Sequence, residues 1–336
     1  MRRTDDKAAV TLSRRKATGL MAGALAGLTI SPSRAQSTYP NRPVRCIVTF
    51  APGGTVDVFA RLAAQYLSQR FGQQFFVENA AGATGNRGTT LAARSAPDGY
   101  TLLFALSTHA VNPALFNNLQ YDAMADFQPI TLAVASTHVL TVHPSVPAKD
   151  ARELVQWLKQ PTTKASYAHG GAGTQGHLLG ERFRLSQNLD VTPVPFTGAG
   201  PAIASVVGGH TPIGWSTMAS AAQMISGGQL RALAVTSKAR SRQLPDTPTM
   251  IEQGFPEIEG DTWVGVMAPA RTPMDIVELL NREISTYIQQ PETRERLAQL
   301  GFEVVGLGPA EFTRSLAQEL VYWKRVVETT GVKLDQ

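Results

Sequence analysis

A glycine-rich run near the middle of the chain contains the residue types that bind anions. It reads HGGAGTQGHL over residues 169–178, and residues 171–176 within it fit the pattern G-x-G-x-x-G. That pattern holds the pyrophosphate of a dinucleotide when it joins a strand to a helix. Glycines let an anion approach the backbone N–H groups of a helix start, so the same turn also suits carboxylates. The run predicts an anion site and leaves the anion open.

The context of this run argues against a dinucleotide. A dinucleotide site needs an acidic residue about 20 positions further on, at the end of the next strand, to hold the ribose. Asp190 has the distance but precedes the strand expected over residues 191–196, which is the wrong end. We therefore predict that the chain binds no nicotinamide and no other cofactor.

A hydrolytic site is also poorly supported. The nucleophile pattern G-x-S-x-G does not occur in the sequence, and the serines near the glycine-rich loops lack an identifiable base. His109 and His177 could in principle serve Ser107 or Thr174, but we expect both rings to cap loops or to face water. No catalytic residue is predicted, and a secreted hydrolase is the weakest of the functions considered.

The sequence offers little to a metal ion. His138 and His143 lie five positions apart on an extended run, so their side chains face opposite ways. Cys46 is the single cysteine of the chain, so neither an intrachain disulfide nor a cysteine-rich metal site can form. We expect Cys46 in a buried strand and predict no metal.

The first 35 residues have the features of an export signal. Basic residues at positions 2, 3 and 14–16 precede an uncharged run over residues 17–30, and Ser33 and Ala35 are small residues where a signal peptidase cleaves. The run of about 14 apolar residues is too short to span a bilayer. We predict cleavage after Ala35, a mature chain that begins at Gln36, and a periplasmic location. Ser13-Arg14-Arg15 indicates the twin-arginine route, while the general secretory route stays open.

Removal of this signal changes the charge balance of the chain. The full sequence has 31 basic and 26 acidic residues and a formal charge of +5. Residues 1–35 contain seven of the basic and two of the acidic residues, which leaves 24 of each in the mature chain. A mature chain with no net charge lacks the excess of basic residues that binds nucleic-acid phosphates, so we predict no nucleic-acid partner.

The rest of the chain alternates strand-like and helix-like patterns. Strands are expected over residues 44–50, 74–78, 100–106, 165–168, 191–196, 211–215, 230–236 and 263–268. Helices are expected from Asp57 to Gly72, after Pro201, and over residues 88–94, 151–159, 177–185, 273–289 and 309–329. Such alternation predicts an α/β fold with a largely parallel sheet.

Two extended crossings divide this series of elements. The first consists of two extended runs that follow Phe127 and lead into residues 139–143, before Pro144 and Pro147. The second begins near Trp263. We predict a discontinuous first lobe, residues 36–138 plus 264–336, and a second lobe, residues 139–263.

Landmarks along almost the whole mature chain resemble one family. They are YPNRP (39–43), FAPGGTVD (50–57), VEN (77–79), GATG (82–85), PDGYTLL (97–103), NP (112–113), YD (121–122), DF (126–127), GT (173–174), HL (177–178), VPF (194–196), Gly198, LRALAVT (230–236), LPDTPT (244–249), EQG (252–254), Trp263 and Trp323. In this order they resemble the Bug family, the extracytoplasmic solute receptors of tripartite tricarboxylate transporters.

The resemblance implies a fold and a function. The expected fold is the two-lobed type II architecture of periplasmic binding proteins, with the ligand cleft between the lobes. The expected function is capture of a mono-, di- or tricarboxylic acid for the membrane permease subunits of such a transporter, by a monomer that is not an enzyme. The alternative is a receptor that presents its ligand-closed form to a membrane sensor protein.

The resemblance also places the ligand in the loops that precede helices, where open α/β sheets bind their ligands. In the first lobe the candidates are Pro52, Gly53, Gly54, Thr55, Asp57, Ala83, Thr84, Gly85, Asn86, Ser107 and Thr108. In the second lobe they are His169, Gly170, Gly173, Thr174, Phe196, Thr197, Gly198, Ala199 and Ser216. These loops have almost no Arg or Lys, so we expect backbone N–H groups, hydroxyls and water to bind the carboxylate. For Asp57, at a helix start, a structural role is favoured over ligand contact.

Four positions depart from the family pattern in ways that concern the ligand. Ser216 stands where many members have Asp, which favours uncharged-tail or dicarboxylic acids over amino acids. Phe196-Thr197-Gly198 replaces the common Tyr-Lys-Gly, and His169 stands where Ser is usual. Trp215 is either an aromatic wall of the site or a core residue.

Overall fold

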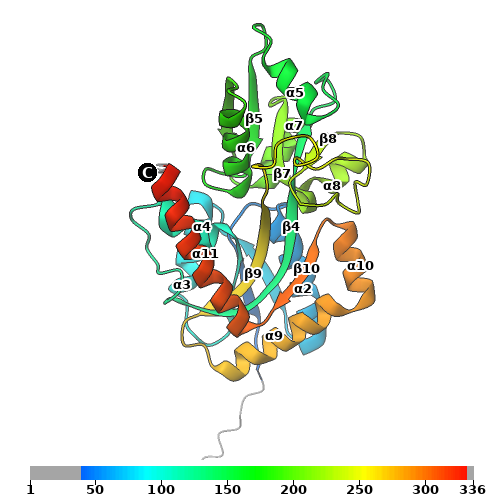
Figure 1. Ribbon diagram of the computed structural model, residues 1–336. Coiled ribbons are helices and arrows are strands. Elements are labelled where there is room, and N and C mark those ends of the chain that lie inside the picture. Colours follow the sequence, from blue (N-terminus) through cyan, green and yellow to red (C-terminus); the bar gives the residue numbers. More distant parts are fainter. Residues whose placement is uncertain (1–38, 331–336) are drawn as a thin grey trace, which may run out of the picture. The chain divides into compact units, whose positions relative to one another are not determined.

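A mixed sheet of ten strands forms the centre of the described chain, which covers residues 39–330 of the computed structural model (Figure 1). Residues 1–38 and 331–336, and with them the predicted signal peptide and its cleavage site, lie outside the described residues. The strand order is β2-β1-β3-β9-β4-β7-β5-β6, and β8 and β10 also pair with β4. The strands are β1 (Val44–Val48), β2 (Phe75–Asn79), β3 (Thr101–Leu106), β4 (Phe127–Val142), β5 (Ala165–His169), β6 (Val191–Pro195), β7 (Ile213–Thr217), β8 (Arg231–Val235), β9 (Asp261–Pro269) and β10 (Glu303–Leu307).

Helices cover both halves of this sheet. They are α2 (Thr55–Phe71), α3 (Asn86–Ala93), α4 (Thr108–Leu115), α5 (Ala151–Leu158), α6 (Gln175–Ser186), α7 (Ala199–Val207), α8 (Met218–Ser226), α9 (Met274–Gln289), α10 (Pro291–Gln299) and α11 (Pro309–Thr330), with a short 3-10 turn η1 (Ala83–Gly85) before α3. Within the described part of the chain, none of these helices has the length and hydropathy needed to cross a bilayer.

Parallel pairing occurs in two groups of strands, one in each lobe. In the first lobe β1 pairs in parallel with β2 and β3, and in the second β5 pairs in parallel with β6 and β7. Helical crossovers produce this arrangement because they return the chain to the same end of the sheet. The strands between the two groups, β4 and β9, are antiparallel to their neighbours, so the sheet is less parallel than the alternating pattern predicts.

Strand β4 belongs to both lobes. Residues up to Thr137 pair with β9, and residues from His138 onward pair with β7. The two extended runs expected after residue 127 are therefore one strand, which runs from the lower lobe into the upper lobe of Figure 1. Strand β9 brings the chain back beside it, in the opposite direction.

Four elements were not expected from the sequence. Helix α4 contains Pro113, and α8, α10 and β10 are short segments with weak periodicity. Tertiary contacts explain two of them: Val111 and Leu115 of α4 are buried beside Trp323 of α11, and β10 pairs with β4, about 170 residues earlier in the chain. Such partners lie too far along the sequence for a local pattern to reveal them.

Each lobe has its own apolar core. In the second lobe Tyr167, Trp215 and Leu140 belong to one buried cluster, and in the first lobe Leu103 and Phe312 belong to another. Cys46 is fully buried in β1, as predicted, and burial raises the pKa of its thiol to about 12. The two cores leave polar residues between them, where the lobes meet.

Candidate functional site

A cavity lies between the two lobes, at the ends of strands where helices begin. Residues of both lobes line it: Phe50, Gly54, Thr55, Val56, Leu106, Ser107, Thr108, His138, Gly170, Thr174, Gln175, Gly176, Ala199, Trp215, Ser216, Thr217 and Thr262. We call this the central cavity. It has about 40 Å³ of space for the centres of water molecules. One water needs at least about 10–15 Å³ by this measure, so the space is small.

Five helices of the described chain begin at this cavity. Its lining includes the first residues of α2 (Thr55), α4 (Thr108), α6 (Gln175) and α7 (Ala199), and the residue that precedes α8 (Thr217). Each helix N-terminus carries unpaired backbone N–H groups and about half a positive elementary charge. Their convergence makes the cavity electropositive without a charged side chain.

Side-chain hydroxyls supply most of the remaining polar groups. Seven residues of the lining carry one: Thr55, Ser107, Thr108, Thr174, Ser216, Thr217 and Thr262. A hydroxyl can donate or accept a hydrogen bond, so it can meet a carboxylate oxygen or a ligand hydroxyl. Among the described residues that line the cavity, none is Lys, Arg, Asp or Glu.

Hydrogen bonds join the lobes around the cavity. Thr55 Oγ1 of α2 lies 2.5 Å from Thr217 Oγ1 and 3.1 Å from Ser220 Oγ of the second lobe. Thr84 Oγ1 donates to the Ala172 carbonyl at 2.6 Å, between the η1 turn and the glycine-rich run. These hydrogen bonds bring the two lobes into contact at the edge of the cavity.

Two glycines allow this close approach. A Cβ at Gly200 would lie 2.4 Å from the Pro52 carbonyl oxygen, and a Cβ at Gly198 would lie 3.1 Å from the Ala51 nitrogen. The Ala51 N–H also donates to the Thr197 carbonyl at 3.4 Å. Any larger residue at Gly200 would push the two loops apart, which explains the small residues on both sides.

A second, wider space adjoins the central cavity. Phe50, Gly82, Ala83, Thr84, Gly170, Gly171, Ala172, Pro195, Phe196 and Thr197 line it, and its volume by the same measure is about 410 Å³. We call this the outer cavity. Phe50 and Gly170 line both spaces, so they are neighbours. The central cavity is the better candidate for the carboxylate because the helix N-termini converge there.

The structure brings twelve of the twenty predicted residues to these two spaces. In the central cavity are Gly54, Thr55, Ser107, Thr108, Gly170, Thr174, Ala199 and Ser216, and in the outer cavity are Ala83, Thr84, Phe196 and Thr197, together with Gly170. The other eight line neither: Pro52, Gly53, Asp57, Gly85, Asn86, His169, Gly173 and Gly198. For these eight residues, contact with the ligand stays a prediction.

Several of these eight hold the loops in place. Asp57 accepts hydrogen bonds from the Gly53 N–H at 3.0 Å and from Asn79 Nδ2 at 2.8 Å, and it pairs with Arg61. Burial alone would raise the pKa of Asp57, but the bonds from Arg61, Gly53 and Asn79 outweigh it and lower the pKa. The carboxylate thus fixes the loop before α2, which is the structural role favoured from the sequence.

The glycine-rich run is fixed in a similar way by two histidines. His169 Nδ1 bonds the Gly171 carbonyl at 2.9 Å, and His177 Nδ1 accepts from the Gly173 N–H at 3.1 Å. The two rings stack with centroids 4.5 Å apart. Thr174 caps α6 by accepting from the His177 N–H. The loop that could have held a pyrophosphate is therefore shaped by its own side chains.

Sequence reasoning did not select several lining residues. Gln175 and Thr217 directly follow predicted residues at helix starts, so extending each loop by one residue would have found them. His138 and Thr262 lie on β4 and β9, and only the pairing of these strands brings them together. Trp215 fits both alternatives, because it packs in the core of the second lobe and also lines the cavity.

Burial keeps the histidines of this region neutral. It lowers the pKa of His138 and of His169 to about 4, and His177, next to His169, contributes to the second shift. His109, outside the cavity, is buried with its Nε2 bonded to the Ala123 carbonyl, and burial lowers its pKa to about 4 as well. Among the described residues, no group of three or more His, Cys, Asp or Glu side chains could hold a metal.

Comparison with known proteins assigns the family. Residues 59–332 match the sequence profile of TctC, described as the Tripartite tricarboxylate transporter family receptor. The chain belongs to this family. Among the relatives of this chain, BugT of Bordetella pertussis is 37% identical over 88% of this chain and 92% of that protein.

Solved structures agree with the TctC assignment. The periplasmic binding protein BugD superposes with a TM-score of 0.84 at 32% identity, over 88% of this chain and 99% of BugD. A protein of R. palustris solved with adipate gives a TM-score of 0.83 at 30% identity, over 87% and 98% of the two chains. MatC from Rhodopseudomonas palustris, solved with bound malate, gives 0.79 at 32% identity, over 86% and 100%. The predictions of a periplasmic-binding-protein fold and of a receptor rather than an enzyme are confirmed.

The buried histidines predict how the stability of this TctC receptor depends on pH. In the unfolded chain a histidine has its ordinary pKa of about 6.5, whereas burial lowers the pKa of His109, His138 and His169 to about 4 in the folded protein. Between these values the unfolded state binds more protons, so the free energy of unfolding should fall as the pH falls from 7 toward 4. Each histidine contributes up to about 1.4 kcal/mol per pH unit.

Urea unfolding at pH 7, 6 and 5 measures this slope. His109→Gln should flatten the slope by up to the contribution of one histidine, whatever its effect on stability at pH 7. His210→Gln, at an exposed residue, is the matched control and should leave the slope as it is. A stability that stays constant from pH 7 to pH 5 would contradict the prediction.

Proposed function

We propose that this protein is a periplasmic receptor that closes two lobes around a small carboxylate and presents it to the membrane subunits of a tripartite tricarboxylate-type transporter. One observation carries the proposal: five helix N-termini and seven hydroxyls converge on a cavity whose lining, in the described chain, contains no charged side chain. Such a site favours a carboxylate, because N–H groups and hydroxyls can surround its oxygens. The adipate and malate of the two solved relatives are ligands of this class.

The same lining narrows the ligand. An amino acid carries an ammonium group, which needs a carboxylate partner when it is buried. Ser216 lines the cavity at the place where many family members have Asp, and no acidic residue of the described chain replaces it there. We propose uncharged-tail or dicarboxylic acids as ligands, bound by the lining residues that were also predicted: Gly54, Thr55, Ser107, Thr108, Gly170, Thr174, Ala199 and Ser216.

The proposed division into lobes is residues 36–138 plus 264–336 and residues 139–263. The change of partner along β4 between Thr137 and His138 supports the first boundary. All of β9 from Asp261 onward pairs with β4 in the first lobe, so the second crossing lies within a few residues of the proposed one. We propose that the lobes move about these two crossings and that the receptor acts as a monomer.

The second candidate function uses the same closed form as a signal. A receptor with contacts between its lobes can be read by a sensor protein as well as by a permease, since both recognise the closed surface. The hydroxyl contacts from Thr55 to Thr217 and Ser220 join the two lobes beside the ligand cleft, so the closed surface would change with the state of the cleft. Genomic neighbours that encode a sensor in place of a permease would favour this candidate.

Titration of the mature protein with propionate, malate, adipate and citrate tests the class of ligand. At least one acid should raise the melting temperature by several °C, since a ligand at 100 times its Kd stabilises a protein by about 2.7 kcal/mol. The acid recovered after incubation should be unchanged by NMR, because we predict no turnover. No shift with any acid, or conversion of a bound acid, would overturn the proposed function.

Expression of the full chain tests its export. Mass spectrometry of the periplasmic protein should find Gln36 as the first residue. The double substitution Arg14→Lys and Arg15→Lys keeps the positive charge but removes the arginine pair, so it should block export if the twin-arginine route is used. If the double variant is still exported, the chain uses the general secretory route. If the wild-type chain stays uncleaved in the cytoplasm, the protein is not a periplasmic receptor.

The contact between the lobes predicts the effect of Ser220→Ala. Ser220 Oγ bonds Thr55 Oγ1 at 3.1 Å but does not line the cavity, so its loss weakens closure without touching the ligand. A hydrogen bond of this kind contributes about 1 kcal/mol, which corresponds to about fivefold weaker binding if only the closed form binds.

Isothermal titration with the acid that binds best measures this change. Ser226→Ala on the same helix is the matched control, because its hydroxyl bonds only the Gln223 carbonyl within α8. Equal affinities of Ser220→Ala and the wild-type protein would show that the hydroxyl contact does not stabilise the closed form.

A further inference from the structure

His138 lies on β4 at the point where this strand passes from one lobe to the other. Its backbone is fixed on both sides, because the His138 N–H donates to Thr236 Oγ1 at 3.0 Å and its carbonyl accepts from the Thr236 N–H at 3.0 Å. Thr236 Oγ1 also donates to the Gly260 carbonyl at 2.8 Å, just before β9. The backbone of His138 is therefore fixed at the point where β4 passes between the lobes.

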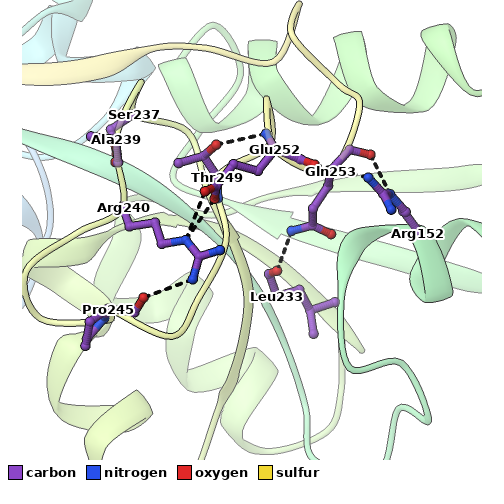
Figure 2. A network of polar contacts seen from close by, with 9 residues as sticks. All are labelled: Arg152, Leu233, Ser237, Ala239, Arg240, Pro245, Thr249, Glu252 and Gln253. Atoms are coloured by element: carbon purple, nitrogen blue, oxygen red, sulfur yellow. Dashed lines mark hydrogen bonds and ion pairs between the residues drawn. The ribbon is translucent and has the colours of Figure 1, made fainter.

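The segment after Thr236 is fixed by its own polar network. Thr249 and Glu252 exchange backbone-to-side-chain hydrogen bonds of 2.7 and 3.0 Å, and Arg240 pairs with Glu252 at 2.9 Å (Figure 2). Arg152 of α5 donates to the Gln253 carbonyl, and Gln253 Nε2 reaches the Leu233 carbonyl of β8. These bonds hold residues 237–253 against β8. They thereby fix the position of Thr236, which in turn fixes the backbone of His138.

The ring of His138 has an unsatisfied nitrogen. The residue lines the central cavity and only 4% of it is exposed. Nε2 lies 3.5 Å from Thr262 Oγ1, at the outer limit of a hydrogen bond, and Nδ1 is buried with no partner among the described residues. An unpaired buried polar atom is destabilising, so a group that bonds this ring would be bound favourably.

The ring is also suited to a neutral polar contact. Burial keeps its pKa near 4 despite the Gly260 carbonyl, which lies near the ring but makes no hydrogen bond to it, so the ring is uncharged at neutral pH. A neutral imidazole offers one donor and one acceptor. The helix N-termini already provide for one carboxylate, which leaves His138 for a second oxygen-bearing group of the ligand.

We propose that His138 contacts the ligand through its unpaired ring nitrogen and selects acids that carry a hydroxyl or a second carboxyl group in addition to the first carboxylate. This inference rests on the proposed function, because it assumes a carboxylate in the central cavity. It assigns the selection to a residue of the crossing strand β4, outside the glycine-rich loops from which the ligand residues were predicted.

Pairs of acids that differ in one oxygen-bearing group test the proposal. Butyrate and succinate differ in a carboxyl group, and propionate and lactate differ in a hydroxyl. Isothermal titration of the wild-type protein should show at least one pair in which the oxygen-rich acid binds more tightly. His138→Phe should lower the affinity for that acid by about tenfold, because one hydrogen bond is lost. The affinity for the other acid of the pair should fall by less than about threefold. His138→Asn, which keeps a polar group near Nδ1, should recover part of the affinity.

His143→Phe is the matched control, since His143 lies just beyond β4 and its ring bonds Ser145 instead of facing the cavity. It should leave all affinities unchanged. If His138→Phe does not fold, ¹⁵N NMR of histidine-labelled wild-type protein replaces it: saturation with the tighter acid should shift the Nδ1 resonance of His138.

The outcomes separate the two proposals. A wild-type protein that binds none of the carboxylates refutes the proposed function itself. If the wild-type protein binds them, the role of His138 alone is refuted by either of two results. One is that His138→Phe loses the same affinity for both acids of a pair, or none. The other is that the Nδ1 resonance of His138 does not move.

Discussion

The convergence of helix N-termini at one cavity is the constraint on which the rest of the structure depends. Five helices from two lobes begin there, and each brings backbone N–H groups to the same small space. Positive helix ends repel one another weakly when nothing lies between them, and an anion removes this cost. An anion in the cavity would therefore favour contact between the lobes without any charged side chain, and the hydroxyls and glycines that surround the cavity suit such an anion.

The crossing strands make this convergence possible. Strand β4 is a single strand of 16 residues that pairs with β9 in one lobe and with β7 in the other. Because the backbone bonds of a strand are continuous, each lobe keeps its register on β4 while the loops at the cleft come together. Residues at the crossing, His138 and Thr262, thereby acquire a place in the cavity that their neighbours in sequence do not share.

Much of the site could be read from local sequence, and the reason is physical. Loops such as residues 52–55 and 170–174 join strands to helices, and a glycine or a capping threonine marks such a junction. The same reasoning does not separate a loop residue that supports its own loop from one that meets the ligand. Asp57 and His169 are typical of a site by type and position, but their polar atoms bond backbone groups of their own loops. Only the tertiary structure distinguishes a side chain that faces the cavity from one that supports its own loop.

The sequence alone determined the α/β class, the series of strands and helices, the loops that form the cleft and the family resemblance, because each follows from short-range patterns of glycine, apolar and capping residues. The tertiary structure decided what depends on distant partners. It made β4 and β9 antiparallel between two parallel groups, added α4 and β10, and placed His138 with Thr262 at the cavity. These features depend on pairing between segments more than 100 residues apart, which a local pattern cannot encode.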